Sequence, residues 1–367
     1  MRVWLWTAAT LALVVVAALL WRGSDAAATE STTAGPAGVP PGTPAGAVSA
    51  AWTSATTTAD GAARVSVHGG RVVVGDEHGV RALDAGTGEE AWRYHRANAV
   101  LCDWTLASGR VVAAFRTEDR CDEAVALVAD TGVRAWTRNV DLRADMTLHG
   151  TDGIVLASSP TGVVTLDPVG DNTRWRQAPT EDCRLLDADV GAAGVVVVQR
   201  CADALQLRLF DGYAGSATWT RDLAGETATL AGVDRAVVVA EDDGVHLYAA
   251  ADGTPLGAPV RDAAEGTVLA QGVGDAVLVL AGGTLTALDQ ETGEPRWETP
   301  ATGLPTGAAA PGTAVPVADH GAVVVRDLAT GTELGRSDVA GLRGGGLTTV
   351  IGPVVVLQLP DRVIAFR

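Results

Sequence analysis

A ten-residue motif that returns about every forty residues limits this chain to a repeat fold more firmly than any other feature of its sequence. The copy LDAGTGEEAW ends at Trp92, and the copy LDQETGEPRW ends at Trp297. Three further copies end in Trp and two weaker copies end in Gly; their last residues are Trp136, Trp175, Trp219, Gly257 and Gly335. This regular spacing predicts one structural unit per copy, packed on its neighbours.

Two further positions recur in register within the copies. Four residues before the end lie Gly88, Gly132, Gly215, Gly253, Gly293 and Gly331, with Asp171 as the exception. Eight residues before the end lie Asp84, Asp167, Asp211, Asp289 and Asp327, with Val128 and Ala249 as departures. An Asp side chain can accept backbone N–H bonds in a turn, and Gly supplies the φ > 0 conformation. Each copy therefore predicts a tight turn before a strand whose Trp packs on the neighbouring unit.

Val-rich and alternating segments precede each turn. RVVVGD (71–76), AVVVAE (236–241) and AVLVLA (276–281) are typical of buried strands, and GVRALD (79–84) alternates like a half-buried strand. With the Trp-bearing strand, these segments give four short strands per unit of about forty residues, which is typical of a propeller blade. The sequence predicts an all-β fold built from four-stranded antiparallel blades.

The two ends of the repeat region predict how the ring closes. Seven complete units run from about residue 60 to 338, and an eighth begins near Ala340 but reaches Arg367 without a Trp-bearing strand. A lone strand of that kind, AVSAAWTSAT, lies around Trp52. We expect the Trp52 strand to complete the last blade, which gives an eight-bladed propeller over residues 48–367. Seven blades is the alternative, if the last stretch forms no blade of its own.

The first 22 residues predict a transmembrane signal-anchor. Residues 3–21 carry no charge, and as a helix they would extend about 28 Å, close to the thickness of the hydrocarbon core. Trp4, Trp6 and Trp21 lie near its two ends, where interfacial aromatic residues are found. A cleaved signal peptide is the alternative. Residues 23–47, rich in Ala, Gly, Pro and Thr, predict a flexible linker.

The four cysteines fall into two pairs with matching placement. Cys102 and Cys121 flank the Val-rich strand of the second unit, and Cys183 and Cys201 flank that of the fourth. Pairing between these units would have to span the blade that separates them, whereas bonded Cα atoms lie within about 7 Å. We predict the disulfides Cys102–Cys121 and Cys183–Cys201, with buried free thiols as the alternative. With the anchor, the chain is expected to be a single-pass cell-membrane protein, and the disulfides favour a propeller on the extracytoplasmic side.

The charged residues indicate no nucleic-acid, metal or catalytic site. The chain has 44 acidic and 27 basic residues and a formal net charge of -17, which repels phosphate backbones. Its six histidines are scattered among the units, and the acidic runs at 117–123 and 241–244 do not match a calcium loop. We predict solvated turns at these runs, no catalytic residue, no metal and no nucleic-acid partner.

The Asp-x-x-x-Gly-x-x-x-Trp repeats resemble the tryptophan-docking motif of the PQQ-binding-like, or quinoprotein alcohol dehydrogenase-like, β-propellers. The resemblance covers residues 48–367. It implies one of two branches. The catalytic branch binds pyrroloquinoline quinone and calcium beneath a disulfide between adjacent cysteines, and this chain has no adjacent cysteines. The non-catalytic, BamB-like branch scaffolds outer-membrane protein assembly; its type protein is a lipoprotein, whereas no Cys precedes Cys102 here.

The resemblance and the anchor together lead to a functional expectation. We expect a membrane-anchored scaffold, held through residues 3–21, that binds a protein or peptide partner in the cell envelope and uses no cofactor. The alternative is a quinone- and calcium-dependent dehydrogenase, or a small-ligand sensor, that uses the central channel. That alternative requires a basic residue and an acidic cluster lining the channel.

Overall fold

The Val-rich segments form strands that are buried within the sheets. The computed structural model describes the chain except residues 1, 171, 261–267, 307–313, 343 and 345, and it leaves out the side chains of residues 2, 3, 5, 8 and 9. In β5 (Arg71–Asp76) only Asp76 is exposed, and all six residues of β25 (Ala276–Ala281) are buried. Val and Ile suit such positions because branched side chains pack well on a pleated surface.

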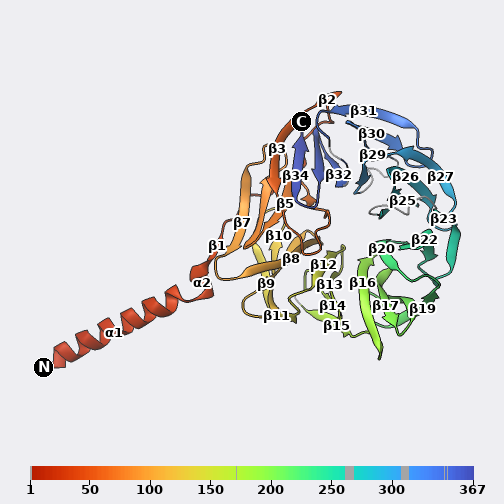
Figure 1. Cartoon of the computed structure of the whole chain (residues 1–367). Helices are drawn as coiled ribbons and strands as arrows, with labels where there is room; N and C mark the ends of the chain where they lie inside the picture. The colour runs from red at the N-terminus through yellow and green to blue at the C-terminus, as the bar shows by residue number, and fades with distance from the viewer. Residues whose placement is uncertain (1, 171, 261–267, 307–313, 343, 345) are drawn as a thin grey trace.

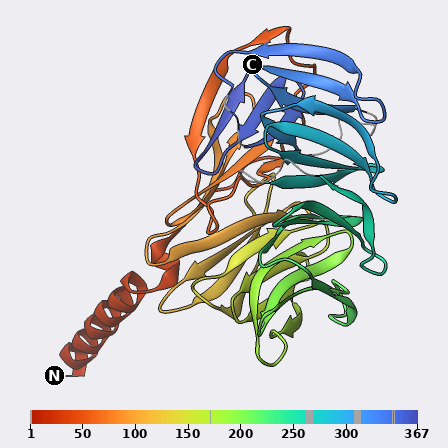
Figure 2. The same cartoon turned by 45° about the vertical axis from the view of Figure 1, so that its right-hand side comes forward.

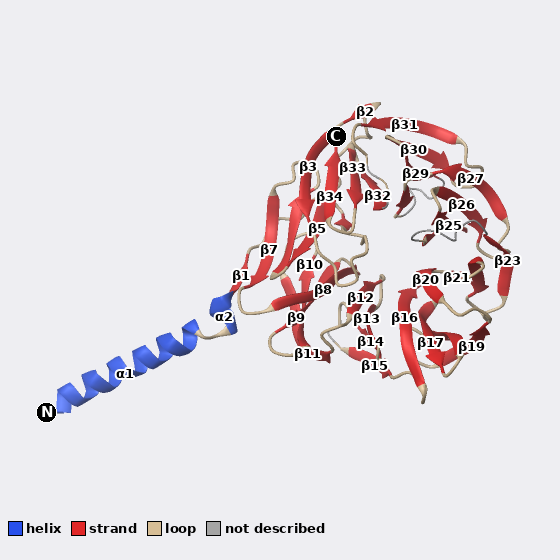
Figure 3. Cartoon of the chain, in the orientation of Figure 1, coloured by secondary structure: helices blue, strands red, loops and turns tan. Residues whose placement is uncertain are grey.

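Repeated four-stranded antiparallel sheets follow one another along the chain, and within each of them the strands pair in chain order. Figure 1 shows these sheets arranged like blades around a common centre, and Figure 3 shows that nearly all the regular structure there is strand. The second to fourth sheets contain β8 (Val100–Ala107), β9 (Arg110–Arg116), β10 (Cys121–Val128) and β11 (Arg134–Leu142); β12 (Thr147–Gly150), β13 (Val155–Ser159), β14 (Gly162–Leu166) and β15 (Thr173–Gln177); and β16 (Cys183–Gly191), β17 (Gly194–Cys201), β18 (Ala204–Phe210) and β19 (Ala217–Leu223). The next two contain β20 (Ala228–Val233), β21 (Ala236–Glu241), β22 (Gly244–Ala249) and β23 (Pro255–Val260); and β24 (Leu269–Val273), β25, β26 (Thr284–Asp289) and β27 (Pro295–Pro300).

The first sheet carries one extra strand. Its four repeat strands are β4 (Val67–His68), β5, β6 (Gly79–Asp84) and β7 (Glu90–Arg96), and β1 (Thr29–Ser31) adds to the outer edge of β7. β1 comes from the segment expected to be a flexible linker. The backbone of that segment also bonds to the repeats beyond β1, with Ala34 donating to Thr131 and Asp338 donating to Gly46. The structure thus differs from the expectation, because a linker with little to bury can still pair its backbone with an exposed edge strand.

The last sheet brings the two ends of the repeat region together. Its strand order is β2-β31-β30-β29-β28-β32-β33-β34-β3. The parallel pairing of β28 with β32 joins two antiparallel groups of four strands, and β3 pairs antiparallel with β34, placing Trp52 opposite Ala365. The predicted pairing of the Trp52 strand with the C-terminal strands is therefore confirmed. The strands are β2 (Ala47–Val48), β3 (Ala50–Ala55), β28 (Gly303–Pro305), β29 (Ala314–Asp319), β30 (Ala322–Asp327), β31 (Glu333–Val339), β32 (Gly346–Ile351), β33 (Val354–Gln358) and β34 (Arg362–Phe366).

Two helices precede the sheets. α1 (Arg2–Arg22) is followed closely by the short α2 (Asp25–Ala28), and Figure 2 shows α1 extending away from the outer edge of the ring. Many apolar side chains of α1 are exposed, among them Trp4 at 82% and Leu20 at 70%. Within the described residues, no helix is found that is both long and apolar enough to cross a membrane.

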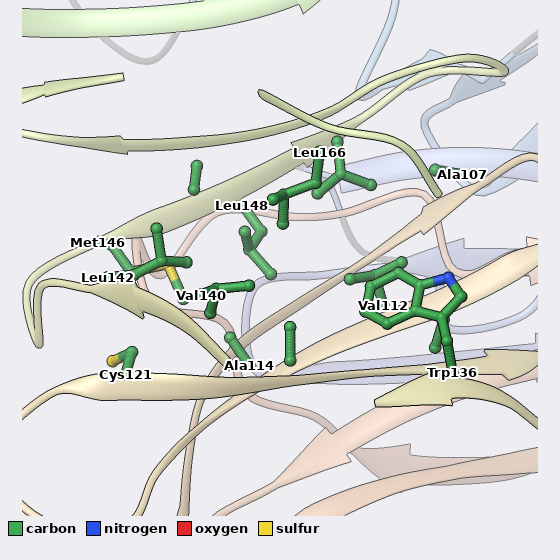
Figure 4. Close-up of a cluster of buried hydrophobic side chains, with 14 residues drawn as sticks. Ala107, Val112, Ala114, Cys121, Trp136, Val140, Leu142, Met146, Leu148 and Leu166 are labelled. Atoms are coloured by element: carbon green, nitrogen blue, oxygen red, sulfur yellow. The ribbon is translucent and has the colours of Figure 1, made fainter. Parts of the chain in front are cut away.

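The core lies between neighbouring sheets, in separate clusters around the ring. In one cluster, Val112 and Ala114 of β9 and Trp136 of β11 pack against the next sheet (Figure 4). Their partners there are Leu148 of β12 and Leu166 of β14. Because each sheet covers the next, Val-rich second strands such as β5, β9 and β25 bury both of their faces. This packing fixes the inner strands and their turns, which line the centre of the ring.

Candidate functional site

Each repeat Trp extends from the outer strand of one sheet to the motif turn of the next. The indole Nε1 of Trp92 donates to the carbonyl oxygen of Ala129 at 2.9 Å, and its ring lies against Gly132. Five other repeat tryptophans make the same bond, at 2.8 to 3.0 Å. These donor and acceptor pairs are Trp52 with Ala85, Trp136 with Pro168, Trp175 with Gly212, Trp219 with Ala250, and Trp297 with Leu328.

The motif glycines make room for these rings. A Cβ at Gly132 would lie 2.6 Å from Trp92, and the backbone there has φ +72°. The glycines in the same relation are Gly88 with Trp52, Gly215 with Trp175, Gly253 with Trp219, and Gly331 with Trp297. Gly293 instead lies against the backbone of Leu256 and Gly257, because Gly257 replaces the Trp of the preceding copy. Asp171 lies outside the described residues.

The motif aspartates close their own turns. Asp211 Oδ1 accepts the backbone N–H groups of Tyr213 at 2.8 Å and Ala214 at 2.6 Å, and these bonds hold the pKa of Asp211 below its usual range. Asp84, Asp167, Asp289 and Asp327 make the same pair of bonds. These residues build the turns of the ring, and the turn of Asp211 also lines the central cavity.

A cavity of about 1070 Å³ occupies the centre of the ring and is the strongest candidate for a functional site. In a meandering sheet, the turns between strands one and two and between strands three and four lie on one face of the ring, which we name the motif face because it carries the motif turns. Turns of both kinds line the cavity, including Gly109, Gly153 and Ala192 of the first kind and Gly212 and Ala251 of the second. The cavity therefore lies toward the motif face.

An arginine from the connection between β3 and β4 forms one wall of the cavity. Arg64 Nη1 lies 2.9 Å from Asp103 Oδ1 and Nη2 lies 3.2 Å from Asp60, and Arg64 also donates to the carbonyl oxygen of Trp104. Asp103 is fully buried, and its Oδ2 accepts the backbone N–H of Leu148 in the next sheet at 2.7 Å. Burial would raise the pKa of Asp60, but Arg64 holds it below its ordinary value.

A histidine–aspartate pair lies on the cavity wall close to this arginine. His149 Nδ1 is 3.2 Å from Asp189 Oδ1, and both side chains are partly exposed to the cavity. Burial would lower the pKa of His149, but the hydrogen bond and charge of Asp189 raise it overall. The His149 imidazolium is thus stabilised by its partner, and the pair forms a charged link between β12 and β16.

Two further aspartates link inner strands in the same way. Asp187 Oδ2 accepts the N–H of Leu230 at 2.8 Å, and Asp234 Oδ2 accepts the N–H of Gly272 at 2.6 Å. Burial raises the pKa of both carboxyl groups above the ordinary value, and it outweighs these hydrogen bonds. The sequence analysis missed this set of residues. The DAD run at 187–189 was a sequence signal for Asp187 and Asp189, because two carboxylates alternate there within one strand.

The cavity residues do not fit the quinone and calcium of the catalytic branch. A quinone that bears several carboxylates needs free cationic donors, whereas Arg64 is the only arginine among the described lining residues and is already paired with Asp60 and Asp103. The described part of the chain also contains no group of three or more His, Cys, Asp or Glu placed to hold a metal ion. The excess of carboxylates instead favours a cationic surface.

Both predicted disulfides are confirmed. Cys102 of β8 bonds Cys121 of β10 with a Cα separation of 6.2 Å, and Cys183 of β16 bonds Cys201 of β17 with a Cα separation of 4.1 Å. Each bond lies within one sheet, away from the cavity. The disulfides thus support the sheets and take no part in the candidate site.

Comparisons with known proteins agree with this architecture. The family described as outer membrane protein assembly factor BamB matches residues 46–164 and 159–326. The crystal structure of BamB from Moraxella catarrhalis aligns with a TM-score of 0.52 and 16% identity, over 87% of this chain and 99% of that chain. The computationally designed protein Ika8 aligns with a TM-score of 0.59 and 15% identity, over 88% and 99%. A quinohemoprotein alcohol dehydrogenase from Pseudomonas putida HK5 gives a TM-score of 0.47 and 14% identity, over 87% and 76%. No curated protein matches the chain significantly.

Proposed function

The chain belongs to the family of the outer membrane protein assembly factor BamB, and on that basis we propose that it is a non-catalytic scaffold that holds a protein or peptide partner in the cell envelope. The observation that carries the proposal is the role of the carboxylates in and behind the cavity wall. Asp103, Asp187 and Asp234 each accept a backbone N–H from the next sheet. Because these carboxylates hold neighbouring sheets together, they support a rigid binding platform rather than an enzyme.

We propose that the ring has eight blades. Six sheets are separate, and the nine-stranded sheet contains two antiparallel groups of four strands that are joined by β28 and β32. Each group corresponds to one copy of the repeat, and β3 completes the second group. An experimental structure with seven radial sheets would overturn this count.

We also propose that residues 3–21 attach the propeller to the cell membrane on its extracytoplasmic side. The support is the sequence, since nineteen consecutive residues carry no charge, together with the exposed apolar side chains of α1. The full chain should float with lipid vesicles and resist extraction at alkaline pH. A variant that lacks residues 2–22 should remain in the soluble fraction, and extraction of the full chain would contradict the attachment.

The partner is proposed to bind at the motif face. Tyr213 in a motif turn is 59% exposed, lines the cavity and lies over Arg174, with the guanidinium carbon 4.7 Å from the ring centroid. Exposed aromatic residues beside acidic groups favour a partner segment that carries basic and apolar side chains.

Quantitative affinity capture from solubilised membranes tests the proposal. Tyr213→Ala should reduce recovery of the partner, whereas His320→Ala should not. His320 is a matched control because it is also exposed but lies in a turn between second and third strands, on the opposite face. If neither variant changes recovery, the motif face is not the binding face. Bound-cofactor absorbance and dye reduction after addition of the quinone and calcium would overturn the non-catalytic assignment.

A further inference from the structure

Residues 25–35 are docked along the outer edge of the ring. β1 pairs antiparallel with β7, placing Glu30 opposite His95, and backbone bonds continue the pairing at both ends. Ala97 donates to the carbonyl oxygen of Ala28 at 2.9 Å, and Thr32 donates to that of Arg93 at 2.9 Å. The chain thus covers the exposed edge of β7 with its own N-terminal segment.

A buried arginine connects this segment to two sheets. The Arg96 side chain is 2% exposed, and it lies 3.3 Å from Asp25 of α2 and 2.6 Å from Glu123 of β10. Asn98 donates a further hydrogen bond of 2.7 Å to Asp25. A guanidinium buried between two carboxylates resists displacement, because loss of either partner leaves a poorly solvated charge.

The disulfide Cys102–Cys121 supports the far side of this contact. Cys121 begins β10 two residues before Glu123, and its bond to Cys102 ties the start of β10 to β8. Contacts therefore run without a break from the disulfide through Glu123 and Arg96 to α2.

The joint between α2 and α1 is short and hydrogen-bonded. Gly23 donates to the carbonyl oxygen of Leu19 at 3.1 Å, and Ser24 donates to that of Trp21 at 3.0 Å. The Ser24 side chain also caps α2 by accepting the N–H of Ala27. Figures 1 and 2 both show α1 leaving the outer edge of the ring beside β1, and in neither view does it cross a face of the ring.

We propose that residues 25–35 form a rigid stalk that turns the edge of the ring formed by the first two sheets toward the lipid bilayer. The stalk replaces the flexible linker that composition predicts. The axis of the ring then lies parallel to the membrane surface. Both faces of the ring, including the motif face, remain accessible to partners. The inference rests on the membrane attachment proposed above, and it adds the surface of the propeller that faces the lipid.

Energy transfer between the ring and lipid headgroups tests the stalk. The full chain is placed in lipid nanodiscs whose headgroups carry an acceptor dye, and a donor is attached to one introduced cysteine. All four native cysteines are in disulfides, so labelling is selective. Glu118→Cys labels the loop beside α2, and Ala258→Cys labels β23 on the far side of the ring. We expect several-fold more efficient transfer from position 118 than from position 258.

A loosened stalk provides the internal comparison. Asp25→Ala with Glu30→Ala removes two exposed stalk carboxylates while Glu123 still pairs with Arg96, and it should bring the two transfer efficiencies together. Glu298→Ala, at an exposed position of β27, should leave the two efficiencies apart. Equal transfer from both positions in the unaltered stalk would overturn the stalk and leave the membrane attachment intact. Failure of the full chain to enter nanodiscs would instead overturn the attachment on which the stalk rests.

Discussion

The indole nitrogen of Trp92 donates to the carbonyl oxygen of Ala129 across the boundary between two sheets. The whole side chain is buried, so Trp92→Ala should lower the free energy of unfolding by about 3–5 kcal/mol. Trp92→Phe keeps most of the apolar contact and should cost less, with about 1 kcal/mol due to the lost hydrogen bond. Urea denaturation measures both values. Leu334→Ala, at an exposed position, should stay within about 0.5 kcal/mol of the parent protein.

Gly132→Ala should destabilise the protein more than Gly321→Ala does. Both glycines have positive φ, +72° and +82°, so each substitution strains the backbone. Only at Gly132 would the new Cβ also meet an indole ring, at 2.6 Å from Trp92, whereas nothing lies within 4 Å at Gly321. The difference in melting temperature between the two variants isolates the contact with Trp92. Equal effects would show that the ring does not constrain this turn.

Removing either disulfide should lower the free energy of unfolding by about 3 kcal/mol, since the bonds close loops of similar length, with sequence separations of 19 and 18 residues. The double variants Cys102→Ser with Cys121→Ser, and Cys183→Ser with Cys201→Ser, can be compared by denaturation without reductant. Addition of a reductant should then lower the stability of the parent protein further than that of either variant. Unchanged stability in either double variant would contradict the prediction for that bond.

The motif turn at Asp289 should contribute stability that acid removes. Hydrogen bonds from Arg296 and from the backbone of Thr292 and Glu291 hold the pKa of Asp289 well below its ordinary value. A depressed folded-state pKa contributes stability above the unfolded-state value of about 3.9, and this contribution is lost as the pH falls below it. Asp289→Asn should therefore flatten the acid limb of the stability curve. Glu298→Gln serves as the control on the neighbouring strand, and an unchanged acid limb in Asp289→Asn would contradict the assignment.

The pair of His149 with Asp189 should have the opposite pH dependence. The pKa of His149 is raised in the folded protein, so its contribution is fully present below the unfolded-state value of about 6.5 and is lost as the pH rises through the folded-state value. Asp189→Asn should destabilise the protein more at about pH 5.5 than at about pH 8.5. A loss of equal size at both pH values would show that the carboxylate acts by packing alone.

The repeat residues were predictable because they serve one local purpose in every unit. The Asp and Gly of each motif form a turn, the Trp packs on the turn of the next sheet, and the cysteines bond strands within one sheet. Residues that recur at one spacing in the sequence therefore recur at equivalent places in the structure. The pairing of β3 with β34 followed from the same register, because one strand was left over at one end and one was missing at the other.

The stalk and the cavity residues were not predictable in this way. Residues 28–35 carry no apolar pattern, and they dock by backbone bonds to an edge strand, which composition does not reveal. Asp103 and Asp187 each lie four residues before the end of the first strand of their sheets, whereas Asp234 lies in a turn. All three bond to backbone groups of other sheets, which a pattern within one repeat does not reveal. His149 and its partner Asp189 lie forty positions apart in the chain, so no local pattern connects them.

The pairing of β3 with β34 also sets the order in which this molecule can be completed. Residues 50–55 are synthesised long before residues 362–366. β3 therefore stays unpaired, or pairs with another sheet, until the intervening sheets have been made. Contacts of such sequence separation form slowly. The ring can therefore close only after residues 362–366 have been made, and a nascent chain interrupted before residue 362 exposes an open edge on which other chains can pair.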